Sequence, residues 1–249
     1  MSKYKIKVLI AQILVIVLFL GIWELLAHKG IINAFIFSSP SKILSTSISL
    51  FQNGELFTHI FITLKEVLVS FILGISIAFV ISVIMYLNKF LADVLDPFLT
   101  MLNSLPKVAL GPIIIIWAGA NSNSIIVMAL LINVIISTIT FYNGFIHTDE
   151  LKIKLFKTFK ANRWKILYKL IIPDNISTIV SSLKINISLT FIGVIMGEFL
   201  VSKGGIGYLI LYGTQVFNLN LVMTGIFILI LLSYGLYKTV ILIEKKLQK

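Results

Sequence analysis

Few side chains in this sequence could do chemistry, and the most notable of them are ionisable groups inside long apolar runs. Lys107, Lys184 and Glu198 each interrupt a hydrophobic stretch, and Ser188 follows Lys184 by one helical turn. A charge near the centre of a bilayer costs at least ~2.5–3.5 kcal/mol, so these groups should face a cavity, a partner or an interface. They predict either a polar pathway or side chains that reach toward the membrane surfaces.

The other polar residues argue against catalysis by this chain. Its three histidines, His28, His59 and His147, fall in separate connections, so no paired ligands of the H-E-x-x-H kind occur and no metal site is expected. Cysteine is absent, which removes thiolate ligands and nucleophiles. The sequence has no G-x-x-x-x-G-K-[ST] phosphate loop, so any ATP must be bound by another chain. We expect a non-catalytic protein without a cofactor of its own.

The elements that carry these residues are too apolar for a soluble protein. Hydrophobic residues make up 58% of the chain and charged residues 12%, and the mean hydropathy is +1.04. A helix needs ~20 apolar residues to cross a bilayer. We therefore expect an all-α polytopic membrane protein, a single domain over residues 1–249, with six spans at about 8–27, 67–87, 94–119, 125–145, 179–201 and 221–243.

The third of these spans carries two prolines, Pro106 and Pro112. Proline kinks a helix and frees a backbone carbonyl, which must find a partner in protein or water. The third span should therefore face neighbours or a cavity. Lys107 would lie either at the inner interface, where a broken helix starts, or in the cytoplasmic vestibule of a pore.

Basic residues predict the orientation of the spans. The net charge of +11 could indicate a nucleic-acid partner, but the charges lie in the connections between apolar runs and no basic, aromatic-rich soluble face is present. If both termini are cytoplasmic, fifteen Lys and Arg residues fall inside and four outside. The sequence thus predicts a multi-pass protein of the cell membrane with both termini in the cytoplasm, lipid as its surroundings and no nucleic-acid partner.

The fifth span has two polar stripes. One holds small and polar residues at helical spacing, namely Ser182, Asn186, Thr190, Gly193 and Gly197. Such a stripe allows close approach of backbones and hydrogen bonds between helices, so its predicted role is packing. The other, roughly opposite, holds Ser181, Lys184, Ser188 and Glu198. Lys184 and Glu198 are ~21 Å apart along a helix, so they mark two depths of one face and do not pair.

The connection at about residues 147–177 is the longest basic segment, and its pattern is helical. At 100° per residue the apolar side chains share one arc and the lysines another; the apolar set is Leu151, Leu155, Phe156 and Phe159. Two interpretations fit this amphipathic segment. It could lie on the anionic inner leaflet, or it could insert its apolar side chains into a groove of a soluble partner.

At this connection the chain resembles the inner-membrane permeases of binding-protein-dependent ABC importers, in particular the nitrate/sulfonate/taurine branch. That family has an E-A-A-x-x-x-G pattern followed by Leu-Pro. Here Pro173 matches the proline, and the run Ala161, Asn162, Arg163, Trp164 matches the segment after the glycine. The start of the pattern differs, because Lys154 replaces the Glu, Leu155 and Phe156 the two alanines, and Lys160 the glycine.

Further matches follow in order along almost the whole chain. They are Trp23-Glu24-Leu25-Leu26, Ser39-Pro40-Ser41, Leu105-Pro106-Lys107 with Pro112 and Trp117, and Glu198-Phe199 with Gly204, Gly205 and Gly207. These glycines predict a turn outside the membrane, and the resemblance suggests that this turn contacts the external binding protein or forms an outer gate.

The resemblance implies a type I importer permease with several partners. These would be two ATPase subunits that bind ATP and Mg²⁺ and dock on the 147–177 loop, a second permease copy in a homodimer or heterodimer, and an extracytoplasmic binding protein. Nitrate, a sulfonate, taurine or a vitamin or pyrimidine precursor would suit the branch as solute. The alternatives are a stand-alone secondary transporter, which should show repeated halves with matching broken helices, and an intramembrane enzyme.

Overall fold

A computed structural model describes residues 3–247, and it is helical throughout this range with short connections. Lys249, one of the lysines used to predict orientation, lies outside the described residues. The long helices are α1 (Lys3–His28), α4 (Glu55–Leu87), α7 (Ser122–Ile146), α11 (Ile176–Val201) and α13 (Leu219–Leu247). The shorter ones are α2 (Ala34–Phe37), α3 (Pro40–Gln52), α5 (Lys89–Ser104), η1 (Lys107–Leu110), α6 (Gly111–Ala118), α8 (Glu150–Thr158), α9 (Arg163–Ile166), η2 (Leu167–Ile171), α10 (Ile172–Asp174) and α12 (Ile206–Gln215).

The five long helices are each long and apolar enough to cross a membrane. The expected all-α polytopic fold is thus confirmed. The second predicted span is longer than expected, because α4 begins at Glu55 rather than near residue 67.

The third predicted span, 94–119, is not one helix. It consists of α5 followed by η1 and α6, and the two parts meet at an angle of 90°. Leu105 has an extended backbone before Pro106, since the residue preceding proline disfavours the helical conformation. Pro112 does not break a helix, because it occupies the first turn of α6, where proline is tolerated. The two parts meet the length and hydropathy required of a span only when they are taken together.

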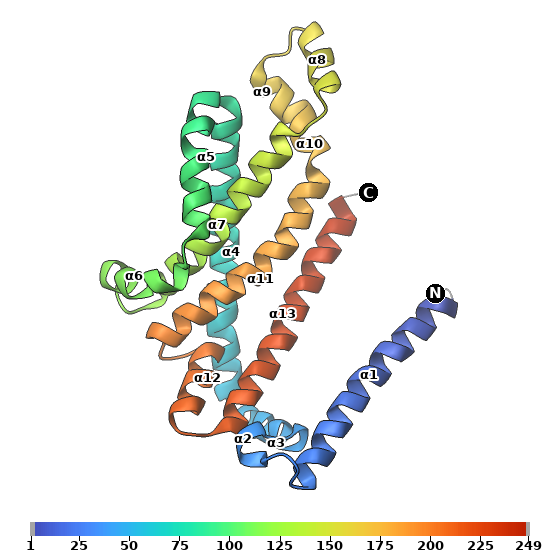
Figure 1. The fold of residues 1–249 in the computed structure, drawn as a ribbon, viewed down its shortest axis with the longest axis vertical. Helices are drawn as coiled ribbons and strands as arrows, with labels where there is room; N and C mark the ends of the chain where they lie inside the picture. Colours follow the sequence, from blue (N-terminus) through green and yellow to red (C-terminus); the bar gives the residue numbers. More distant parts are fainter. Residues whose placement is uncertain (1–2, 248–249) are drawn as a thin grey trace.

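The core of the molecule is the packing of α7 between α4 and α11, with α13 beside α11. In Figure 1 these helices run side by side, with α8 and α9 at the upper end and α12 at the lower end. We call the end with α8 and α9 the loop end, and the end with α12 the turn end. Buried apolar clusters follow one another along the bundle, with Phe141 and Phe145 in the cluster near the loop end and Leu50 and Ile206 in that near the turn end.

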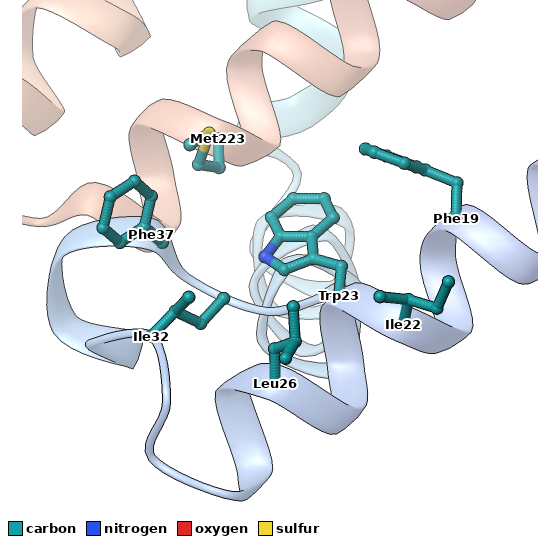
Figure 2. A pocket seen from close by; sticks show the side chains of 7 residues that line it. All are labelled: Phe19, Ile22, Trp23, Leu26, Ile32, Phe37 and Met223. Carbon is teal, nitrogen blue, oxygen red and sulfur yellow. The ribbon is translucent and has the colours of Figure 1, made fainter.

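Helix α1 stands apart from this bundle. Figure 1 shows that it leans away from the other long helices and meets them only at its lower end, beside α2 and α3. Only Ala27 is buried among its residues. The divergence leaves an apolar pocket of about 400 Å³ that is lined by α1, α2 and α13 (Figure 2), with Trp23 pointing into it and Met223 opposite. Among the lining side chains, the indole N–H of Trp23 is the one strong hydrogen-bond group, so the pocket is suited to an apolar group.

Candidate functional site

Polar side chains join the three core helices in the middle of the bundle. The amide of Asn133 on α7 donates to the Ser70 carbonyl on α4 at 3.2 Å and to Thr190 Oγ1 on α11 at 2.9 Å. One turn further, Ser137 Oγ donates to Asn186 Oδ1 at 2.7 Å. All of these groups are buried, and a buried polar side chain is stabilised only when it is paired. Asn186 and Thr190, predicted as packing residues, thus lie at the α7–α11 contact.

The glycines of the same stripe let the two backbones approach each other. A Cβ atom on Gly193 would lie 2.5 Å from the Ala129 Cα, and one on Gly197 would lie 2.9 Å from the Ile125 Cα. Both distances are shorter than any real contact, so only glycine fits. Four residues of the predicted packing stripe therefore share one face of α11, and that face lies against α7: Asn186, Thr190, Gly193 and Gly197.

Glu198 lies at the turn end of α11 and is 0% exposed. Thr63 Oγ1 on α4 donates to its Oε1 at 2.7 Å, and the Gly207 N–H donates to its Oε2 at 2.5 Å. The Thr63 hydroxyl also accepts from the Ile206 N–H at 2.8 Å. The carboxyl group is thus enclosed within this chain. It joins α4, α11 and the start of α12.

The glycine turn encloses this carboxyl group. Gly205 has φ +101° and ψ 168°, a conformation that only glycine adopts readily, and a Cβ there would lie 2.4 Å from Glu198 Oε1. A Cβ on Gly207 would lie 2.7 Å from Oε2. The Gly205 N–H donates to His59 Nδ1 at 3.0 Å, and Ser202 Oγ donates to the Gly204 carbonyl. The three predicted glycines thus hold a tight turn over Glu198.

A second buried acid, Glu66, lies beside Glu198, and no sequence pattern singles it out. It is 3% exposed, and Ser122 at the start of α7 donates to its Oε1 at 2.7 Å. Glu66 and Ser122 also line a cavity of about 380 Å³ at the turn end, together with Lys203 and Gly204. The sequence offers little sign of this contact, because Lys65-Glu66 reads as an ordinary charged pair at the edge of a span.

The remaining predicted pathway residues do not form one set with Glu198. Lys184 is half-buried and Ser188 is exposed on α11, on the side away from the buried packing stripe. Lys107 begins η1, at the 90° bend. That position lies the length of α5, ~24 Å, from the start of α5 at the loop end.

The predicted coupling segment forms a projecting surface at the loop end. Leu151, Leu155 and Phe159 are exposed in a row along α8, and the exposed fraction of Phe159 is 77%. Phe156 points the other way and packs against the apolar cluster around Phe145. The predicted apolar arc is thus divided between an outward row and an inward side chain. Trp164 is exposed on the neighbouring α9.

Several contacts fix this surface to the bundle. The Arg163 guanidinium donates to the Leu87 carbonyl, the last of α4, at 2.9 Å. Lys152 Nζ lies 2.5 Å from Asp174 Oδ1, and this hydrogen bond raises the pKa of the Lys152 ammonium. Ala161 packs beside the apolar cluster, and Pro173 lies in the first turn of α10. The segment that carries the exposed row is therefore connected to the helix bundle by these contacts.

Lys160 provides a first testable prediction. Its φ is +54°, the left-handed conformation, and this is the position where the resembling family has glycine. A side chain in that conformation costs roughly 1–2 kcal/mol, partly offset by the greater freedom of glycine in the unfolded chain. Lys160→Gly should therefore stabilise the protein by up to about 1 kcal/mol. Lys154→Gly, inside α8, should destabilise it by about 1 kcal/mol. Thermal unfolding in detergent checks both, and a lower midpoint for Lys160→Gly would contradict the prediction.

Comparison with known proteins shows which family this chain is similar to. The family described as "Binding-protein-dependent transport system inner membrane component" matches residues 70–248. A probable ABC transporter permease protein of Haemophilus influenzae is 29% identical over 92% of this chain and 93% of its own length. A putative aliphatic sulfonates transport permease protein of Bacillus subtilis is 28% identical over 92% of this chain and 83% of its own. A formylaminopyrimidine transport permease protein of Halalkalibacterium halodurans is 28% identical over 75% and 74%.

A solved structure shares the fold. A chain of the MetNI methionine ABC transporter, in an inward-facing conformation, superposes with a TM-score of 0.67 at 18% identity, covering 77% of this chain and 95% of its own.

Proposed function

Because the chain belongs to the family of binding-protein-dependent transport system inner membrane components, we propose that it forms the translocation pathway of an ATP-driven importer and that the exposed row on α8 docks the ATPase. The row of Leu151, Leu155 and Phe159 is the observation that carries this proposal. The chain binds no nucleotide through a phosphate loop of its own, so ATP and Mg²⁺ belong on the partner.

The exposed row suits a protein groove better than a lipid surface. Its three residues recur every four positions along α8 and its C-cap residue, which is the spacing with which an amphipathic helix fills a groove. The Arg163 bond joins α9 to the end of α4, and the Lys152–Asp174 pair joins α8 to α10. Through these bonds a displacement of the docked ATPase can be transmitted to α4 and α11. We place this end in the cytoplasm, together with both termini, in keeping with the excess of basic residues there.

The rest of the assembly follows from the family. Two ATPase subunits would serve a pair of permease copies, either two of this chain or this chain with a related one. An external binding protein would deliver the solute at the turn end, where Gly204, Gly205 and Gly207 form the turn over Glu198. A sulfonate and a pyrimidine precursor are both candidate solutes, because relatives of similar identity are named for each.

The test of docking is affinity purification of the complete complex in mild detergent. The double variant Leu155→Asp, Phe159→Asp should reduce the ATPase that co-purifies by at least about tenfold. Two carboxylates placed in an apolar contact would lose their water without gaining a partner. Phe217→Asp is the matched control, since Phe217 is an equally exposed phenylalanine near the turn end. It should retain the ATPase.

Two results would count against the proposal. If the double variant is inserted and monodisperse and still retains the ATPase, the α8 row is not the docking surface. If the wild-type chain alone moves solute in proteoliposomes under an ion gradient, the chain is a secondary transporter and not an importer subunit.

A further inference from the structure

Helix α5 has exposed faces of opposite character. Its polar residues lie within about 100° of arc at helical spacing, and all are exposed: Asp93, Asp96, Thr100, Asn103 and Ser104. A separate exposed arc is apolar and includes Val94, Phe98 and Met101. The third side, with the buried Ala92, packs against α4 and α7. One exposed arc is thus suited to lipid and the other to water.

The polar arc extends along most of the length of the spanning helices. α5 has 16 residues and is ~24 Å long, so its far end lies most of a bilayer's thickness from its start. Gly111, four residues beyond Lys107, lies against Met128 of α7. Met128 is six residues from the Ser122 end of α7, or ~9 Å inside that end. Asn103 and Lys107 therefore lie between the two ends of the spanning helices.

At that depth the Lys107 amino group lies beside the polar arc. Its Nζ donates to the Asn103 carbonyl at 2.8 Å and to Asn103 Oδ1 at 3.4 Å, both on the same residue. An ammonium has three N–H donors, so a further acceptor can bind. The ion pairs of Lys152 with Asp174 and of Lys154 with Glu150 lie far from the bend. Lipid would not tolerate this set of groups, but an aqueous passage would.

We propose that the polar arc of α5 borders the water-filled pathway and that Lys107 binds the anionic group of the solute at the bend. The inference rests on the proposed function and narrows the solute to a small oxyanion or an organic molecule with an oxyanion group. A lysine ammonium is a compact point charge that suits such a group. Asn103 orients the ammonium by accepting from it, so Asn103 is a positioning residue.

The absence of cysteine from the chain allows a direct test. Single cysteines would be introduced at Asn103 on the polar arc and at Met101 on the apolar arc, in the complete complex in proteoliposomes. The probes are two methanethiosulfonates of similar size, one carrying a sulfonate and one a trimethylammonium group. Asn103→Cys should react at least about tenfold faster than Met101→Cys, because only thiols in contact with water ionise readily.

The charge of Lys107 should also set which probe reacts faster. At Asn103→Cys the ratio of anionic to cationic labelling rates should fall at least about fivefold when Lys107→Gln is added, since one unit charge nearby acts with opposite sign on the two probes. Lys107→Arg should preserve the ratio. Lys203→Gln, the same change at an exposed lysine of the turn end, should leave it unchanged.

Two outcomes would overturn the inference. If Asn103→Cys is as unreactive as Met101→Cys, the polar arc is covered by lipid or protein. If it reacts but Lys107→Gln leaves the ratio unchanged, Lys107 is neutralised, for instance by an acid of a second copy, and selects no anion. A failure of the proposed function would be seen separately. The wild-type chain would then not co-purify with an ATPase, while the ratios of anionic to cationic labelling rates would be unaffected.

Discussion

Gly205→Ala should lower the free energy of unfolding by about 2–6 kcal/mol, one of the two largest effects that we expect from a single substitution. Gly205 has φ +101° and ψ 168°, where a side chain costs roughly 1–3 kcal/mol. Its Cβ would also lie 2.4 Å from Glu198 Oε1, and overpacking of this kind costs roughly 1–3 kcal/mol more. The thermal midpoint in detergent should fall by about 10 °C, given roughly 2–4 °C per kcal/mol for a chain of this size.

Two further variants separate the two causes of this effect. Gly54 has φ +74° and ψ −3°, the milder left-handed helical conformation, and no atom lies within 4 Å of the position that a Cβ would take there, so Gly54→Ala should cost only roughly 1–2 kcal/mol. In a Glu198→Ala background the overlap disappears, and Gly205→Ala should then cost about 1–3 kcal/mol. If Gly205→Ala costs the same with and without Glu198, the turn does not close over the carboxyl group as the structure shows.

The apolar spans could be predicted from the sequence because lipid imposes a local requirement. Each helix must satisfy its own backbone groups and present apolar side chains, so composition alone reveals it. The packing stripe of α11 could be predicted for the same kind of reason, since Asn186, Thr190, Gly193 and Gly197 recur at helical spacing within one segment. Their placement against α7 is what the structure adds.

The site at the turn end could not be predicted in this way. Glu198 is bonded by Thr63, which is 135 residues distant in the sequence, and Glu66 is bonded by Ser122, 56 residues away. No periodicity within one helix encodes these contacts. The sequence displays the charge of Glu198 and the glycines of the turn, but it does not show that the turn closes over the carboxyl group.

Breaks and faces were predicted only in part. Pro106 indicated that the third span is interrupted, but the angle of 90° depends on the packing of α6 against α7 and α11. The apolar arc of the coupling segment was visible in the sequence, yet helical spacing does not say which side of an arc meets the body of the protein. Phe156 and Phe159 illustrate this, since the first packs inward and the second is exposed.

The second large effect is expected at the contact between α7 and α11. Gly193→Val should destabilise the protein by at least about 3 kcal/mol, because its Cβ would lie 2.5 Å from the Ala129 Cα and 3.2 Å from the Ala129 N. Backbone atoms cannot rotate away, so the helices must separate, and the hydrogen bond from Asn133 to Thr190 would lengthen with them. Size-exclusion profiles and thermal unfolding in detergent should show loss of monodisperse, folded protein.

Controls show whether the close approach of backbones is the cause. Gly235→Val places the same side chain on α13 where nothing lies within 4 Å, and it should leave the thermal midpoint almost unchanged. Ala129→Gly should rescue Gly193→Val only slightly, because the shortest contact is to the Ala129 Cα and not to its Cβ. A full rescue would mean that α7 and α11 are held by side-chain packing and that the backbones have room to spare. A partial or absent rescue means that glycine at 193 sets the helix separation, and with it the geometry in which Asn133 bonds both of its neighbouring helices.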